Sequence, residues 1–280
     1  MRFSFHTHSD FCDGHAKAAE MAAAAAREGY SILGFSSHAP LPFKTDWTMA
    51  REDLGPYMEE LGRLKSFYAG SGLTILAGLE IDFIAGLVSP ADAFFRTLDF
   101  DFTIGSVHYI SSLPGGSFTV DEPAEDFEKD LVKATGGDAR PLWKEYYRSL
   151  IAMMDSGGFD ILGHFDLVKK NNSGGRWFDE EDKAYLDAAF QAADRAGELG
   201  LVAELNTGGI ARGKTLSTYP SLPILRRMRE AKVRLTIGDD AHSPKHLGAY
   251  QELAVDVARA AGYENLWYLD GKGIWKELGI

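Results

Sequence analysis

Short apolar runs alternate with helical segments along the whole chain of 280 residues. The apolar runs fall at residues 2–5, 31–35, 73–79, 102–107, 159–163, 201–205, 233–237 and 266–269. The helical segments fall at residues 16–28, 51–69, 140–156, 180–199, 221–231 and 244–261. Such alternation is typical of a parallel sheet covered by helices. About seven or eight strand–helix units in a chain of this length predict an α/β fold of the TIM-like barrel type.

One stretch interrupts the alternation. Residues 111–139 carry several prolines and glycines, with room for one short helix at residues 124–133. Because proline and glycine break regular elements, we expect this stretch to be an insertion over one end of the domain. The whole chain, residues 1–280, is expected to form a single domain that includes this insertion at residues 111–139.

Most of the histidines share one topological position, at or just past the end of a predicted strand. A glutamate and an aspartate fall at the same position, so that the set comprises His6, His8, His38, Glu80, His108, His164, Asp240 and His242. His15 and His246 instead lie in the loop or helix start that follows a strand. In a barrel of parallel strands, the ends converge on one face. His6 and His8 are two positions apart, so on an extended strand end both imidazoles point to the same side.

Metal binding explains this placement better than independent structural histidines do. Nitrogen and carboxylate ligands without thiolate suit Zn²⁺, Mn²⁺ or Fe²⁺, whereas calcium prefers oxygen ligands. The candidates are too many for one ion, so two or three clustered divalent ions are expected, as in hydrolases. We expect His246 at the surface and Cys12 in packing. His15 is left open between a substrate contact and a helix N-terminal residue.

Composition limits the kinds of binding partner and the cellular compartment that we expect for this protein. The net charge of −12 weighs against a general nucleic-acid surface. Cys12 is the only cysteine, which favours a reducing compartment. The sequence shows no leader pattern, and no apolar run approaches the roughly 20 residues of a membrane span. A cytoplasmic location without membrane contact is therefore expected.

Several motifs occur in a defined order from residue 6 to residue 242. They are His6-Thr7-His8, Asp13-Gly14, His38, Glu80, Gly105-Ser106-Val107-His108, Gly163-His164-Phe165-Asp166 and Asp240-Ala241-His242. This series resembles the PHP (polymerase and histidinol phosphatase) superfamily. The resemblance covers nearly the whole chain and implies a distorted (β/α)7 barrel with a trinuclear metal centre.

The resemblance also implies a set of ligands for each ion. The first ion would be held by His6, His8, Glu80 and Asp240. The second would be held by Glu80, His108 and His164, with Glu80 bridging. The third would be held by Asp13, His38 and His242, although His15 could take the place of Asp13.

Within the superfamily, the chain most resembles stand-alone histidinol phosphatases. Segments such as His38-Ala39-Pro40-Leu41-Pro42 and Glu204-Leu205-Asn206-Thr207-Gly208-Gly209 carry this likeness. It implies a metal-dependent phosphomonoesterase that hydrolyses L-histidinol phosphate in histidine biosynthesis, with a small phosphorylated metabolite as partner, as a monomer or small homo-oligomer. Two departures concern substrate preference. Asp239 stands where the superfamily usually has serine, and Lys169 and Lys170 stand where a phosphate-binding arginine is common.

The remaining candidates concern phosphate binding and proton transfer. Arg212 follows a strand end and is the first candidate for a phosphate clamp, with Lys169 the second. A solvated surface charge is the alternative for both. The catalytic candidates are His15, His242 and Asp240, and His15 is also a candidate substrate contact. The leaving alkoxide needs a proton, which His15, His242 or a metal-bound water could supply.

Acidic residues of the predicted insertion add one further possibility. They are Asp121, Glu122, Glu125 and Asp126. These could meet a cationic amino group such as that of histidinol, although a solvated face is favoured.

Three other functions compete with this interpretation. A PHP-type phosphoesterase could act on another small ester or on nucleotide ends, but the acidic balance argues against a nuclease. An amidohydrolase-like C–N hydrolase usually bridges two ions with a lysine, whereas Glu80 fills that position here. A metal-binding module without activity would leave the convergence of so many ligands unexplained.

Overall fold

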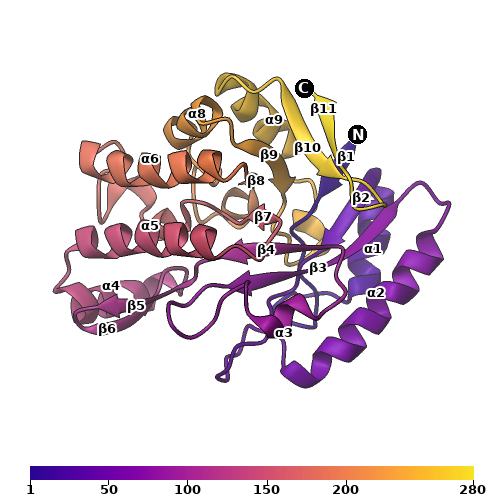
Figure 1. Cartoon of the computed structure of the whole chain (residues 1–280), viewed down its shortest axis with the longest axis horizontal. Coiled ribbons are helices and arrows are strands. Elements are labelled where there is room, and N and C mark those ends of the chain that lie inside the picture. The colour runs from indigo at the N-terminus through magenta and orange to yellow at the C-terminus, as the bar shows by residue number, and fades with distance from the viewer.

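Seven parallel strands form the centre of the molecule. The computed structural model describes residues 1–280, and its main sheet runs in the order β1-β2-β3-β4-β7-β8-β9 (Figure 1). These strands are β1 (Arg2–Ser4), β2 (Tyr30–Phe35), β3 (Thr74–Asp82), β4 (Phe102–Ser106), β7 (Ile161–Leu162), β8 (Val202–Asn206) and β9 (Arg234–Gly238). The last strand returns to the first, because the Phe5 amide donates to the Ile237 carbonyl at 3.3 Å. Thr7 and Ala241 also form a parallel bridge. The predicted distorted barrel is thereby confirmed, with seven strands.

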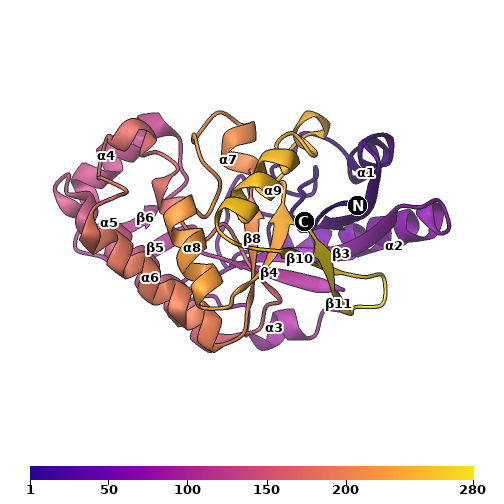
Figure 2. The ribbon, with the colours of Figure 1, turned by 90° about the horizontal axis from the view of Figure 1, so that it is seen from above.

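Helices cover the outside of this barrel. Those following the barrel strands are α1 (Ala18–Arg27), α2 (Leu54–Tyr68), α3 (Ala93–Arg96), α5 (Ala139–Ser156), α6 (Lys183–Glu198), α7 (Gly208–Ala211), α8 (Leu222–Glu230) and α9 (Gln251–Ala260). Figure 1 shows α5 and α6 side by side on one flank and α1 and α2 on the opposite flank. From above, in Figure 2, α8 and α9 lie over the strands at the end of the chain. The buried apolar side chains fill the space between helices and sheet.

Several helix boundaries differ from the sequence prediction, and two of the differences have a clear local cause. Helix α6 starts later than expected because Asp182 caps it, accepting hydrogen bonds from the amides of Ala184 at 2.7 Å and Tyr185 at 3.2 Å. The single helix predicted at 244–261 is instead a 3₁₀ turn, η4 (Pro244–His246), followed by α9. Gly248 separates them with φ +67°, a left-handed conformation that a continuing helix cannot include.

The last apolar run is not a barrel strand. Strand β10 (Asn265–Leu269) pairs antiparallel with β11 (Trp275–Gly279). The sequence analysis did not predict β11. This hairpin packs on the N-terminal end of the barrel, where the ring of Tyr268 lies 5.9 Å from that of Phe3. The ring centroids of Trp275 and Phe5 are 6.0 Å apart at the same end of the barrel. One end of the barrel is thus covered by aromatic side chains, and the other end carries the site.

The predicted insertion forms a compact unit beside the barrel. It contains the hairpin β5 (Tyr109–Leu113) and β6 (Gly116–Thr119), followed by α4 (Ala124–Thr135). Phe127 of α4 packs edge to face on Phe118 of the hairpin, with ring centroids 5.1 Å apart. Both rings belong to the same buried cluster as the core of the barrel. The loop after β6 reaches the open end of the barrel, where Asp121 and Glu122 line the cavity. That these residues are an insertion relative to other proteins stays a prediction.

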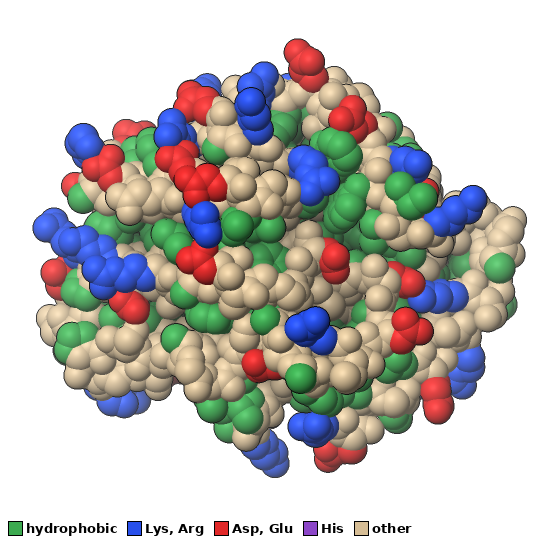
Figure 3. Space-filling model, viewed as in Figure 1, with side chains coloured by type: hydrophobic (Ala, Val, Ile, Leu, Met, Phe, Trp, Pro, Cys, Tyr) green, Lys and Arg blue, Asp and Glu red, His purple; other side chains and the backbone are tan.

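The sequence analysis argued against a nucleic-acid surface and a membrane span, and the structure allows both features to be inspected. On the face shown in Figure 3, acidic and basic side chains are interspersed rather than gathered by sign. No helix combines the length and the apolar character that crossing a bilayer requires.

Candidate metal centre

The strand-end residues meet at the C-terminal end of the barrel. They line a cavity of about 490 Å³ that is open to solvent. The lining residues that the sequence analysis singled out are Asp13, His15, His38, Glu80, His108, Asp121, Glu122, His164, Lys170, Arg212, Asp240, His242 and His246. His6 and His8 lie beneath this lining and are fully buried. Segments more than 230 positions apart in sequence therefore build one site.

Glu80 is the hub of the cluster. Its Oε1 lies 2.8 Å from His164 Nε2 and 3.7 Å from His108 Nε2. Its Oε2 lies 3.1 Å from His6 Nε2 and 3.0 Å from His38 Nδ1. Burial alone would raise the pKa of Glu80, but His6 and His38 beside it hold that pKa well below its usual range. A single ionised carboxylate thus faces two sets of imidazoles, as a bridging ligand would.

A second carboxylate, that of Asp240, lies beside His6 and His8. Asp240 Oδ1 lies 3.5 Å from His8 Nε2 and 4.0 Å from His6 Nε2. Burial would raise the pKa of Asp240, but the Arg212 guanidinium and His6 hold it well below its usual range. Arg212 donates to Asp240 Oδ2 at 2.8 Å.

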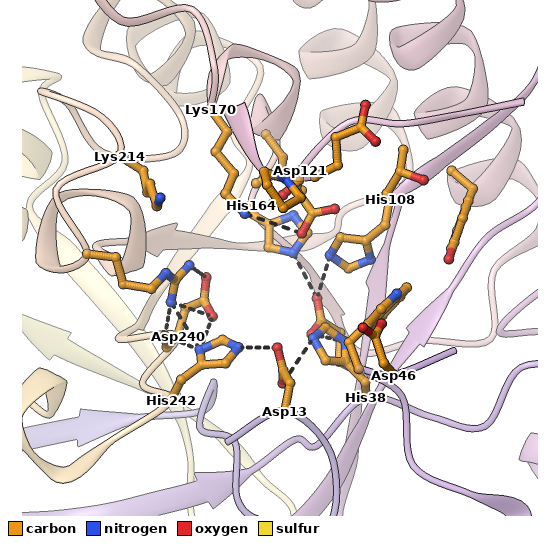
Figure 4. A pocket seen from close by; sticks show the side chains of 18 of the residues that line it. Asp13, His38, Asp46, His108, Asp121, His164, Lys170, Lys214, Asp240 and His242 are labelled. Atoms are coloured by element: carbon orange, nitrogen blue, oxygen red, sulfur yellow. Dashed lines mark hydrogen bonds and ion pairs between the residues drawn. The ribbon is translucent and has the colours of Figure 1, made fainter. Parts of the chain in front are cut away.

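Asp13 stands between two histidines at the cavity wall (Figure 4). Its Oδ2 lies 3.1 Å from His242 Nε2, and its Oδ1 lies 3.8 Å from His38 Nε2 and 3.7 Å from His8 Nδ1. His8 stacks on His242, with ring centroids 4.0 Å apart. The loop after β1 therefore carries Asp13 across the cluster, away from Glu80.

The arrangement fits divalent cations. Histidine and carboxylate side chains form four groups, and within each group the candidate ligand atoms all lie within 4.8 Å of one another. Some residues belong to two groups. The groups are His6–Glu80–His164, His6–His8–Asp240, His8–Asp13–His38–His242 and His38–Asp82–His108. Several of these atoms are buried without a hydrogen-bond partner, including His8 Nε2 and Asp13 Oδ1. Because a buried polar atom without a partner is costly, an ion with nitrogen and oxygen ligands would satisfy them.

A layer behind the histidines fixes their rings. Glu204 presents both carboxylate oxygens to His6 Nδ1, at 2.9 and 3.0 Å. Asp82 Oδ1 lies 2.8 Å from His108 Nδ1. Neither residue was predicted as part of the site. A signal existed, since Glu204 is a charge inside an apolar strand and Asp82 lies two residues past Glu80, on the same face.

The two residues predicted to bind phosphate, Arg212 and Lys169, lie in different surroundings, and only Arg212 lines the cavity. Arg212 reaches the cavity, but its guanidinium is held by Asp240 and also donates to His242 Nδ1 at 3.1 Å. Lys169 needs a correction, because its ammonium is buried in an ion pair with Asp166 at 2.9 Å and donates to the Thr218 carbonyl. A 3₁₀ turn at Leu167–Lys169 points this lysine inward. The next residue, Lys170, lines the cavity instead.

The remaining candidates lie at the rim. His15 lines the cavity and is exposed, and its amide donates to the His242 carbonyl at 2.7 Å. His246 was expected at the surface; it is half-buried and lines the cavity, with its Nδ1 3.1 Å from Ser243 Oγ. Cys12 packs beneath the lining, with its sulfur 3.5 Å from His8 Nδ1.

Comparison with known proteins places this geometry in a family. The PHP domain model matches residues 4–208. A protein of Deinococcus radiodurans named "Probable histidinol-phosphatase" is 33% identical over 264 residues, covering 92% of each chain. The histidinol-phosphatase of Bacillus subtilis is 27% identical, covering 88% of this chain and 96% of that protein.

Two crystal structures share the fold. One, a protein of Listeria monocytogenes assigned as a histidinol phosphatase, superposes with a TM-score of 0.77 at 22% identity and covers 90% of this chain and 99% of that one. The other, histidinol phosphate phosphatase of Lactococcus lactis in complex with zinc, L-histidinol and phosphate, has a TM-score of 0.69 at 19% identity and covers 96% of this chain and 97% of that one.

Proposed function

The chain belongs to the PHP domain family, and on that premise we propose that it hydrolyses L-histidinol phosphate to L-histidinol and phosphate. It is a phosphoric monoester hydrolase, as its curated relatives are named. One observation carries the proposal: histidine–carboxylate groups that share His6, His8 and His38 meet around Glu80 at the open end of the barrel. The reaction would be a step of histidine biosynthesis.

Two or three ions of zinc, manganese or iron would occupy the cluster. The proposed ligands are His6, His8, Glu80 and Asp240 for the first ion, Glu80, His108 and His164 for the second, and Asp13, His38 and His242 for the third. Bound ions of this kind neutralise phosphoryl charge and make a water more acidic.

The side chains around the cluster bind and orient the ester. Arg212 is held in place by Asp240, which fixes the plane of its guanidinium at the cavity wall. The ammonium of Lys214 lies on the same side and adds a point charge. Together they would receive phosphoryl oxygens.

The leaving alkoxide requires a proton. His242 and Asp240 belong to the histidine–carboxylate groups, so both are engaged within the cluster. His15 lines the cavity outside those groups. We therefore assign His15 to donate this proton, with His242 as the alternative.

Phosphate release from a panel of monoesters, on protein whose metal content has been measured, tests the proposal. The panel contains L-histidinol phosphate, a nucleoside monophosphate and a small amide. Phosphate release from L-histidinol phosphate is expected, with loss after chelation and recovery after metal is restored. Full activity of the chelated protein, or cleavage of the amide alone, would overturn it.

A further inference from the structure

Asp239 and Asp240 follow strand β9 as neighbours, but their side chains lie in different surroundings. Asp240 lines the cavity (Figure 4). Asp239 is completely buried and is not among the residues that line the cavity. The residue that stands where the superfamily usually has serine therefore does not touch a substrate in the cavity. Any effect that it has on the site passes through the backbone that it shares with Asp240.

Asp239 ties the end of β9 to three other elements behind the cavity. Its Oδ2 accepts a hydrogen bond from the hydroxyl of Tyr30, at the start of β2. Its Oδ1 accepts from Gln251 Nε2 at 3.0 Å, at the start of α9. Its amide donates to Ser4 Oγ at 2.9 Å, at the end of β1. Because a carboxylate presents two acceptor oxygens, one side chain holds partners on both β2 and α9.

The same partners also bind one another. Gln251 Nε2 lies 3.2 Å from the Tyr30 hydroxyl and donates to the Phe3 carbonyl of β1 at 2.9 Å. Tyr30, Gln251 and Ser4 are all buried. Since buried hydrogen bonds in a connected network fix side chains strongly, the position of Asp239 is set by the barrel strands and α9 together.

The backbone at Asp240 requires such support. Its φ is +49°, in the left-handed region that residues other than glycine rarely adopt. A conformation of this kind persists where the surrounding contacts impose it. On the cavity side, Arg212 donates to the Asp240 carbonyl at 2.5 Å and to Asp240 Oδ2 at 2.8 Å. On the opposite side, the hydrogen bonds of Asp239 hold the residue that precedes it.

We propose that Asp239 is a positioning residue, whose hydrogen bonds to Tyr30 and Gln251 hold the Asp240 carboxylate beside His6 and His8. Tyr30 does not line the cavity, so it acts on the cluster through Asp239. The aspartate at position 239 thus serves the metal ligand next to it and not substrate preference. This inference rests on the proposed function, in which Asp240 is a ligand of the first ion.

Zn²⁺ affinity of the full-length protein, measured by competition with a coloured chelator, tests this role. Tyr30→Phe keeps the ring and removes only the hydroxyl that donates to Asp239. One Zn²⁺ site should bind about tenfold more weakly, since outer partners of a metal ligand typically contribute about 10–100-fold. Asp239→Asn should weaken the same site. The double variant Tyr30→Phe/Asp239→Asn should bind no more weakly than Asp239→Asn alone, because Tyr30 acts through Asp239.

Tyr263→Phe is the matched control, because it also removes a buried hydroxyl beside β9. Tyr263 donates to the Val233 carbonyl at 3.1 Å, immediately before β9 begins. This variant should lose stability but keep wild-type Zn²⁺ affinity. If Tyr30→Phe also lost stability alone and kept its Zn²⁺ affinity, the positioning role would be wrong. Additive losses of affinity in the double variant would contradict it as well.

Crystal structures of the metal-free wild type and Tyr30→Phe separate this inference from the proposed function. The Asp240 carboxylate should move away from His6 and His8 in the variant, and an unchanged position would overturn the inference. If the metal-loaded wild type released no phosphate from L-histidinol phosphate, the proposed function would be wrong. The position of Asp240 in the two structures would then decide the role of Asp239 by itself.

Discussion

Both carboxylate oxygens of Glu204 lie within hydrogen-bond distance of His6 Nδ1, at 2.9 and 3.0 Å. Glu204 also accepts from the His164 amide at 2.7 Å and from Asn206 Nδ2 at 2.9 Å. One side chain of β8 thereby joins the segment after β1 to the segment after β7. Because Nδ1 of His6 is engaged, its Nε2 is directed toward Glu80 and the cluster.

Glu204→Gln should weaken metal binding without unfolding the barrel. The amide can keep one hydrogen bond but loses the charge that orients His6, and such changes typically cost 10–100-fold in metal affinity. Metal titration followed by elemental analysis measures this, and circular dichroism checks the fold. Glu198→Gln, an exposed position on α6, is the control and should bind metal normally. Wild-type affinity in Glu204→Gln would rule out this positioning role.

Removing the hub should abolish activity. Glu80→Gln leaves the volume intact but removes the charge that faces His6, His38 and His164. We expect phosphate release to fall by more than about 1,000-fold, since loss of a shared ligand disrupts each group that contains it. His8→Ala should act in the same direction. A Glu80→Gln enzyme with near wild-type turnover and metal content would contradict the role of Glu80.

A glycine beneath the cluster offers a structural test. A Cβ at Gly238 would clash with Glu204 Oε2, so Gly238→Ala must displace that carboxylate. The expected cost is about 1–3 kcal/mol in the free energy of unfolding, together with weaker metal binding. Gly55→Ala on α2 meets nothing within 4 Å and should stabilise by about 0.4–1 kcal/mol. Urea denaturation of both variants measures the change in the free energy of unfolding. Equal changes in the two variants would refute the prediction.

The sequence predicted the site better than it predicted the surroundings. Strand ends on one barrel face bring together residues distant in sequence, so His6, His108 and His242 could be placed by topology alone. The pairing of β10 with β11 could not be predicted, because a short apolar run shows no sign of its partner or direction. Lys169 and Lys170 are adjacent, and only the local 3₁₀ turn decides which one faces the cavity. Glu204 was missed because buried second-layer contacts depend on side-chain packing.

A pH dependence of stability follows from Glu122. Burial, with Asp130 and other nearby acids, raises the pKa of Glu122 from its ordinary value of 4.5 to about 7. Between these values the folded state keeps a proton that the unfolded state has released, so the free energy of unfolding falls as pH rises through this window. Glu122→Gln removes the titrating group, and with it this fall in the free energy of unfolding at higher pH. The variant should melt higher than wild type at pH 8 and equally at pH 4, whereas Glu277→Gln should show no such difference. A pH-independent offset would contradict the raised pKa.

The buried ion pair of Lys169 provides the last test, because it separates a structural lysine from a phosphate-binding one. Lys169 and Asp166 are both almost completely buried, and Asp166 Oδ2 also accepts from the Ser221 amide at 2.9 Å. Lys169→Met would leave Asp166 charged and without its main partner, which typically costs about 3–5 kcal/mol.

The double variant Lys169→Met/Asp166→Asn should recover part of that stability, since no unpaired charge then remains. Lys214→Met should leave stability unchanged and raise the KM for the phosphate ester, because Lys214 is exposed at the cavity. Chemical denaturation and steady-state kinetics on the three variants measure both quantities. If Lys169→Met were as stable as wild type and raised KM instead, Lys169 would bind phosphate as the sequence suggested, and the structural assignment would be wrong.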